Sequence, residues 1–225
     1  MAQNEFSAES PQNYEQKSIC CFAVDVSGSM SNSPIDLLNQ GLQEFHRDIA
    51  ENSMTANRLE VAVVEFSDSV DTIVQPALAD TFTMPRLTTK GSTKLVDGVR
   101  EAINLVESRK NWYKQTGQPY LRPWIILITD GAPDGDQDVN GLAQEIQSGV
   151  SGKKFVFLAL GVQGANRSVL NKISSPDMPP AALQGLKFLE FFKWVSASMS
   201  VVASSKDGDK VDLPSPAHWM QGFKI

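Results

Sequence analysis

Two aspartates stand where a chain of alternating strands and helices could bind a ligand. Asp25 ends an apolar segment, in FAVDVSGSM, and Asp130 directly follows another, in IILITDG. Thr93 lies in KGSTKL, a glycine-containing loop just before a predicted helix. In open α/β sheets, ligands bind outside the carboxyl ends of the strands, near the point where the strand order reverses. We therefore expect Asp25, Thr93 and Asp130 to deliver oxygen atoms to one edge of a sheet.

The loop after Asp25 adds two hydroxyls. Ser27 and Ser29 are two residues apart, so both can turn toward one ion, and Gly28 lets the backbone between them bend sharply. Asp25 sits one step back and can hold a coordinated water. Two carboxylates and three hydroxyls form a hard ligand set, which suits Mg²⁺, Mn²⁺ or Ca²⁺ and disfavours Zn²⁺. Mg²⁺ keeps several waters, so a position is left open for an acidic side chain of a partner.

The elements that must position these residues follow from the hydrophobic pattern. Near-continuous apolar runs predict buried strands at 18–26, 59–66, 124–129 and 155–160, and 70–74 is predicted to pair antiparallel with the second. Helices are predicted from 33 to 49 (with Ser33 as the cap), 94 to 106, 138 to 146, 167 to 174 and 188 to 204. Residues 109–123 are predicted as a polar loop. The order predicts a doubly wound α/β fold: a mostly parallel sheet with one antiparallel edge strand and helices on both faces.

Bulk properties fit one domain. The chain has 225 residues, 41% of them hydrophobic, and we expect a flexible arm at 1–17, one domain at 18–204 and a tail at 205–225. The net charge of −6 argues against a general nucleic-acid or anionic-membrane binder, because such binding needs clustered Lys and Arg. No apolar run approaches the roughly 18 residues of a membrane helix, and the polar N-terminus has no signal-peptide core. Cys20 and Cys21 are expected as buried thiols, and the protein as cytoplasmic.

Three motifs together resemble a known site. DVSGSM at 25–30, GST at 91–93 and TDG at 129–131 look like the metal-ion-dependent adhesion site of von Willebrand factor A domains. The resemblance covers roughly residues 18–204 and implies that family's Rossmann-like fold. It implies that Ser27, Ser29 and Thr93 are hydroxyl ligands, with Thr93 engaging directly when a partner is bound. Asp25 and Asp130 would then act mostly through water.

The second half is similar to a narrower group. RPW at 122–124, TDGAP at 129–133, FLEFFKWVSASMSVVASS at 188–205 and DLP at 212–214 resemble bacterial stand-alone A-domain proteins of the tellurium-resistance-associated type. That resemblance implies a cytoplasmic adaptor in a stress-response or phosphosignalling system, with kinase-like or phosphatase-like partners. The function expected overall is a non-enzymatic, Mg²⁺-dependent protein-binding module.

Two alternatives remain open. One is a Mg²⁺-dependent phosphohydrolase of the haloacid-dehalogenase type, with Asp25 as nucleophile and Gly135-Asp136 echoing its acidic motif. That pattern needs a second Asp at residue 27 as general acid, and Ser27 cannot supply a proton near neutral pH. The other alternative is a metal-free scaffold, which would not respond to divalent cations.

The acid-rich segment after Asp130 has two interpretations. Asp134, Asp136 and Asp138, with Glu145, echo a Ca²⁺-binding EF-hand loop, but Val139 stands where that loop needs glycine. A solvated loop with Asp138 as a helix cap is the favoured interpretation.

Two further groups of residues each have a functional and an ordinary explanation. Lys90 and Lys94 flank Thr93, where they would attract an acidic partner or be ordinary loop lysines. Four aromatic residues near 109–124 would form a recognition patch or, as we favour, pack onto the domain. They are Trp112, Tyr113, Tyr120 and Trp124.

Overall fold

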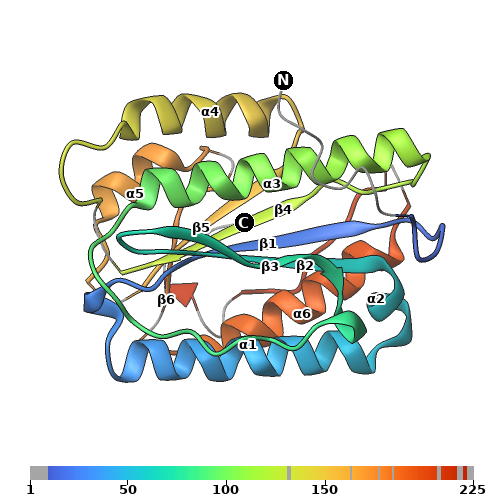
Figure 1. Ribbon diagram of the computed structural model, residues 1–225, viewed down its shortest axis with the longest axis horizontal. Helices are drawn as coiled ribbons and strands as arrows, with labels where there is room; N and C mark the ends of the chain where they lie inside the picture. Colours follow the sequence, from blue (N-terminus) through green and yellow to red (C-terminus); the bar gives the residue numbers. More distant parts are fainter. Residues whose placement is uncertain are drawn as a thin grey trace.

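A central sheet of seven strands, in the order β3-β2-β1-β4-β5-β6-β7, forms the middle layer of the computed structural model (Figure 1). The structure describes residues 10–130, 133–162, 164–176, 178–183, 185–206, 209–216 and 220–221. The strands are β1 (Ser18–Asp25), β2 (Leu59–Phe66), β3 (Val70–Leu78), β4 (Trp124–Thr129), β5 (Val156–Gly161), β6 (Ala181–Leu183) and β7 (Met220–Gln221).

The sheet is mostly parallel, as predicted. Five strands run parallel to one another, in the order β2-β1-β4-β5-β6, and β3 pairs antiparallel with β2 at one edge. At the other edge β7, a two-residue strand within the expected tail, adds a second antiparallel pairing. Every residue of β1, β2 and β4 is buried, which is why these segments are apolar almost throughout.

Helices cover both faces of the sheet. Figure 1 shows α1 (Ser33–Glu51), α2 (Ser53–Arg58) and α6 (Phe188–Ser204) on one side. On the other side lie α3 (Leu95–Thr116), α4 (Val139–Ser151) and α5 (Arg167–Ile173). Two 3₁₀ turns, Gly28–Met30 and Ala79–Thr81, complete the regular elements. Each face has its own cluster of buried apolar side chains, so the doubly wound α/β fold is confirmed.

The prediction of a polar loop at 109–123 is wrong for residues 109–116, which are helical. Helix α3 continues to Thr116 and ends on Gly117 in the left-handed conformation. Arg109, Trp112 and Tyr113 are all buried on one side of this helix, Tyr113 completely. Of the four aromatic residues considered as a patch, Trp112, Tyr113 and Trp124 are buried and Tyr120 is partly buried, so they pack onto the domain, as favoured.

The start of α1 also differs in detail. The apolar stripe predicted from Ile35 to Ile49 is buried as expected, and Pro34 lies in the first turn. Ser33 is already helical, and the cap position is Asn32, whose φ of 65° is in the left-handed region. The helix therefore begins one residue earlier than predicted.

The segments outside the predicted domain make contacts with it. Of the arm expected at 1–17, the described part places Glu15 beside Arg58 at 2.8 Å, and buries Lys17. The Lys17 N–H donates to the Pro119 carbonyl at 2.8 Å. In the tail, the Pro214 carbonyl accepts a hydrogen bond from Trp194 Nε1 at 2.7 Å. Because polar groups near both ends find partners on the domain, residues 13–17 and 214 are held against it.

Two smaller expectations concern the cysteines and membrane helices. Cys20 and Cys21 are free and buried, as predicted. In the part of the chain that the structure describes, no helix has the length and apolarity needed to cross a membrane.

Candidate metal centre

The candidate site lies where the strand order reverses. β1 and β4 are neighbours, and the chain proceeds from β1 toward one edge of the sheet and from β4 toward the other. Asp25 ends β1 and Asp130 directly follows β4, so both carboxylates stand at the carboxyl ends of the two central strands. This is the position at which sheets of this type bind ligands.

The loop after β1 is folded by its own side chains. Asp25 Oδ1 accepts a hydrogen bond from the Ser27 N–H at 2.9 Å, and the Ser27 and Ser29 hydroxyls lie 3.1 Å apart. Ser27 is buried and Ser29 is exposed, so the pair spans the boundary between protein and solvent. The structure thus brings these two hydroxyls together, as their spacing predicted.

The glycine requirement lies in a different loop from the one expected. Gly28 has no positive φ, and a Cβ there would meet the Gly91 carbonyl oxygen at an ordinary 3.6 Å. Gly91 has a φ of +53°, and a Cβ there would stand 1.5 Å from Asp68 Oδ1. The prediction that Gly28 provides a sharp bend is therefore not supported, whereas Gly91 needs both its conformation and its missing side chain.

Backbone hydrogen bonds join the loop containing Thr93 to the other two. The Gly28 N–H donates to the Gly91 carbonyl at 3.1 Å, and the Lys90 N–H donates to the Val26 carbonyl at 2.7 Å. On the other side, the Thr93 N–H donates to Asp134 Oδ2 at 2.7 Å. The Asp134 N–H donates back to the Thr93 carbonyl at 3.1 Å. Thr93 is thereby held between the β1 and β4 loops through its backbone, and its hydroxyl takes no part in these bonds.

A direct contact closes the site across the sheet. The Ser29 hydroxyl donates to Asp130 Oδ1 at 2.8 Å, although the two residues are 101 positions apart. All five sequence-predicted residues therefore belong to three loops that are hydrogen-bonded to one another.

Thr129 is a residue of this site that the sequence analysis missed. Its hydroxyl donates to Asp25 Oδ2 at 2.6 Å, and its side chain is completely buried. With Ser27 on Oδ1 and Thr129 on Oδ2, both oxygens of Asp25 are fixed in orientation. The available signal was its position: it is the last residue of β4, next to Asp130, and its hydroxyl interrupts an otherwise apolar strand.

The two acids of the site, Asp25 and Asp130, have no positively charged partner among the ion pairs of the described residues. Burial raises the pKa of Asp25, and the nearby Asp130 carboxylate adds to that rise. Burial also raises the pKa of Asp130, against the hydrogen bond from Ser29. Among the ion pairs of the described residues, none includes either carboxylate. A cation at this edge would supply the missing charge.

The donor set fits a hard divalent cation. In the described part of the chain, no three His, Cys, Asp or Glu side chains are grouped closely enough to hold an ion. Any ion here would consequently depend on the hydroxyls of Ser27, Ser29 and Thr93, and hydroxyl with carboxylate oxygens suits Mg²⁺, Mn²⁺ or Ca²⁺.

The neighbouring acidic segment is engaged in structural contacts. Asp138 caps α4 by accepting the Gly141 N–H at 2.8 Å, as favoured, and it pairs with Arg100 at 3.0 Å. Asp134 is bound to the Thr93 backbone. Asp134 and Asp138, two of the three aspartates that echo a Ca²⁺ loop, thus already bind groups of the protein.

The flanking lysines behave differently from each other. Lys90 forms an ion pair with Glu65 at 2.6 Å, and that contact raises the pKa of Lys90. Lys94 is exposed and precedes the first residue of α3. Of the two lysines, Lys94 is the one without an ion-pair partner among the described residues.

Comparisons with known proteins agree with this architecture. Residues 20–184 match the family model of the von Willebrand factor type A domain. The collagen alpha-5(VI) chain of Mus musculus is 26% identical over 165 residues, which are 71% of this chain and 6% of that protein. The chain therefore spans only a small part of that relative.

Solved structures show the same fold. The pilus adhesin SpaC from Lactobacillus rhamnosus GG superposes with a TM-score of 0.66 at 15% identity, over 86% of this chain and 32% of that one. Proximal thread matrix protein 1 from the mussel byssus, with a zinc-occupied MIDAS motif, has a TM-score of 0.52 at 21% identity. That comparison covers 85% of this chain and 46% of the byssus protein.

Domains of this kind are typically divalent-cation-dependent protein-interaction modules and are generally not enzymes. The matched region begins inside β1 and ends just after β6, so it contains Asp25, Thr93 and Asp130 together with the sheet that positions them. The chain belongs to the von Willebrand factor type A domain family.

Proposed function

We propose that this protein binds Mg²⁺ through Asp25, Ser27, Ser29, Thr93 and Asp130, and uses it to hold a carboxylate of a protein partner. The observation that carries the proposal is the pair Asp25 and Asp130: two partly or fully buried acids at the switch point with no cationic partner among the described ion pairs. When bound, the ion supplies positive charge and an open coordination position for the partner's acid.

The residues of the chain have distinct parts in this proposal. Ser27 and Ser29 present hydroxyl oxygens 3.1 Å apart, and Thr93 presents a third from the neighbouring loop. Asp25 is oriented by Ser27 and Thr129, so it holds a coordinated water in a fixed place. Asp130 accepts a hydrogen bond from Ser29, and its negative charge would balance the positive charge of the ion.

The wider role is an extension of the sequence resemblance. We propose that the domain comprises residues 18–204, flanked by segments 1–17 and 205–225, and that the protein works in the cytoplasm. Its role there is that of an adaptor for kinase-like or phosphatase-like proteins of a tellurium-resistance-type stress response. The exposed Lys94 beside the site favours an acidic partner surface.

A phosphohydrolase is the less favoured function. A nucleophilic Asp25 would need an oxygen free to attack, yet Asp25 is 0% exposed and both of its oxygens accept hydrogen bonds. Asp136, the other acid of that alternative, is exposed. This burial supports a structural use of Asp25.

The proposal is tested by thermal unfolding with metals. The wild type, Ser29→Ala and the exposed-residue control Asp136→Ala are melted in EDTA, Mg²⁺, Mn²⁺, Ca²⁺ and Zn²⁺. At 100-fold excess over Kd, a native-state ligand stabilises by about 2.7 kcal/mol, which corresponds to roughly 5–10 °C in a domain of this size. We expect that shift with Mg²⁺ in the wild type and Asp136→Ala, and its loss in Ser29→Ala.

Equal melting temperatures for the wild type in EDTA and in millimolar Mg²⁺ would contradict the site. A larger shift with Zn²⁺ than with Mg²⁺ would contradict the choice of metal. Pull-down of partners with and without EDTA then tests the binding role, since a carboxylate held through the ion must be released by the chelator.

A further inference from the structure

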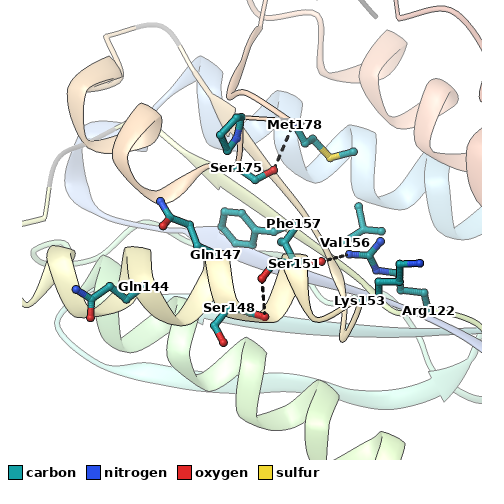
Figure 2. Close-up of a pocket in the computed structure, with 12 residues that line it drawn as sticks. Arg122, Gln144, Gln147, Ser148, Ser151, Lys153, Val156, Phe157, Ser175 and Met178 are labelled. Carbon is teal, nitrogen blue, oxygen red and sulfur yellow. Dashed lines mark hydrogen bonds between the residues drawn. The ribbon is translucent and has the colours of Figure 1, made fainter.

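A cavity lies near the amino-terminal ends of β4 and β5, whereas the candidate metal centre lies at the carboxyl ends of the strands. It has a volume of about 780 Å³ and opens between the C-terminal half of α4, the start of β5 and the residues Ser175, Pro176 and Met178 that follow α5 (Figure 2). Cavities that bind small molecules typically measure about 300–1,000 Å³. The size is therefore suitable for a ligand of moderate length.

The charge of this cavity is opposite to that of the protein. The chain carries a net charge of −6, yet the described residues lining the cavity include two cations, Arg122 and Lys153, and no acid. An anion entering this space would meet no like charge from those side chains.

Arg122 is held in place by the backbone. Its Nη2 donates to the Val150 carbonyl at 2.8 Å and to the Phe155 carbonyl at 2.7 Å. Its Nε is buried and has no hydrogen-bond partner among the described residues. A guanidinium has five N–H donors: the contacts of Nη2 orient this one, and the Nη1 donors, which make no hydrogen bond to the described residues, are left for a ligand. Burial lowers the pKa of Arg122, and among the described residues no acid offsets that cost.

Lys153 lines the cavity and has an unusual backbone conformation. It follows the end of α4 with a φ of 54°, in the left-handed region that favours glycine. The Lys153 N–H donates to the Val150 carbonyl at 3.0 Å, which fixes this turn beside Arg122's own contact with the same carbonyl. The guanidinium of Arg122 and the backbone of Lys153 are consequently anchored to the same helix end.

The remaining lining suits a ligand with both apolar and amide groups. One face of α4 contributes four uncharged hydrogen-bonding side chains, and β5 and the loop after α5 contribute apolar ones (Figure 2). The polar group comprises Gln144, Gln147, Ser148 and Ser151, and the apolar group includes Val156, Phe157 and Met178.

We propose that this cavity binds a carboxylate ligand of the acylated amino acid type, with the carboxylate at Arg122 and Lys153. The amide of such a ligand meets the glutamines and serines of α4, and its apolar side chain lies against Phe157 and Met178. The site is separate from the metal centre in both position and chemistry, so it does not depend on the function proposed above.

The test is a titration of the full chain in EDTA, followed by calorimetry and by amide NMR shifts. The probes are N-acetylphenylalanine, its neutral amide and phenyl phosphate. We expect N-acetylphenylalanine to bind, to shift the Ser148 and Ser151 amides, and to bind about tenfold or more tightly than the neutral amide. Equal binding of acid and amide would overturn the proposal, and tighter binding of phenyl phosphate would overturn the carboxylate assignment.

Variants locate the site. Arg122→Gln should lose at least about tenfold in affinity for N-acetylphenylalanine. Because Arg122 also supports the fold, Lys153→Gln provides a second variant, with Lys154→Gln as its neighbour of equal charge change that does not line the cavity. Weaker binding by Lys153→Gln and unchanged binding by Lys154→Gln are expected. Equal affinities of these two variants would overturn the assignment.

Discussion

Arg109 and Glu60 form a buried, two-pronged ion pair far from the candidate metal centre, near the beginning of β2. Arg109 Nε lies 2.7 Å from Glu60 Oε2 and Nη2 lies 2.8 Å from Oε1. Both side chains are less than 10% exposed. The Tyr113 hydroxyl donates to the same Oε2 at 2.7 Å. This arrangement fastens the second half of α3 to the sheet.

Glu60→Ala should strongly destabilise the protein. Removing the acidic partner of a buried pair, here the Glu60 carboxylate that faces Arg109, costs roughly 3–5 kcal/mol. The matched control is Glu15→Ala, whose partner Arg58 and own side chain are more exposed, and which should change stability by no more than about 1 kcal/mol. Urea unfolding measures both. A similar loss of unfolding free energy in the two variants would show that the buried pair stabilises the fold no more than the exposed one.

The strands could be predicted from the sequence, but the end of α3, which the buried pair holds, could not. The strands were predictable because residues buried on both faces are continuously apolar, as in β1 and β4. The end of α3 was not, since Arg109 and Lys110 read as solvated charges while the structure buries both. Lys110 pairs locally with Glu107, but the groups that hold the two cations in the interior, Glu60 and the Lys154 carbonyl, are more than 40 residues distant in sequence, and no local pattern reveals them.

Thr129→Val should weaken Mg²⁺ binding while leaving the fold intact. Valine keeps the shape of threonine in β4 but removes the hydroxyl that holds Asp25 Oδ2 at 2.6 Å. Residues that orient metal ligands typically contribute about 10–100-fold in affinity. The measurement is the Mg²⁺ concentration at half of the full thermal shift. Thr116→Val, near the end of α3, is the control, and an unchanged midpoint in Thr129→Val would exclude a positioning role.

Gly91→Ala should disturb the site more than Gly28→Ala. At Gly91 the φ of +53° costs an alanine about 1–2 kcal/mol. Its Cβ would also displace Asp68, whereas Gly28 has room for a methyl group. We therefore expect Gly91→Ala to lower both the melting temperature and the apparent Mg²⁺ affinity. The reverse order of the two variants would place the conformational requirement back in the β1 loop.

These glycines show how far the site itself was predictable. The five candidate ligands could be chosen from sequence because each follows a strand or precedes a helix. Which glycine is needed depends on how the loops meet, through the contact of Gly28 N–H with the Gly91 carbonyl, and on a side chain from a third loop, Asp68. Thr129 was missed for a similar reason: only the pairing of β1 with β4 puts its hydroxyl beside Asp25.

Cys20 and Cys21 should be unreactive in the folded protein. Both are 0% exposed, and burial raises the pKa of each thiol. The thiolate is the reactive form, so little of it exists near neutral pH. Ellman's reagent should therefore detect both thiols in guanidinium chloride and neither under native conditions. Rapid native labelling would show that β1 opens readily, in conflict with its central place in the sheet.

Gly41→Ala should destabilise the protein even though alanine is the better helix former. Alanine in place of a helical glycine normally gains about 1 kcal/mol. Here, however, a Cβ on α1 would stand 2.2 Å from Cδ2 of Phe192 on α6. Phe192 is fully buried and its ring contacts Phe22 and Phe45, so it has no space into which to retreat. Overpacking of this kind costs typically 1–3 kcal/mol. Urea unfolding of Gly41→Ala against the exposed neighbour Gln40→Ala measures the difference. Stabilisation in both variants would mean that α1 and α6 can move apart, and that the close approach of these helices is not required by the fold.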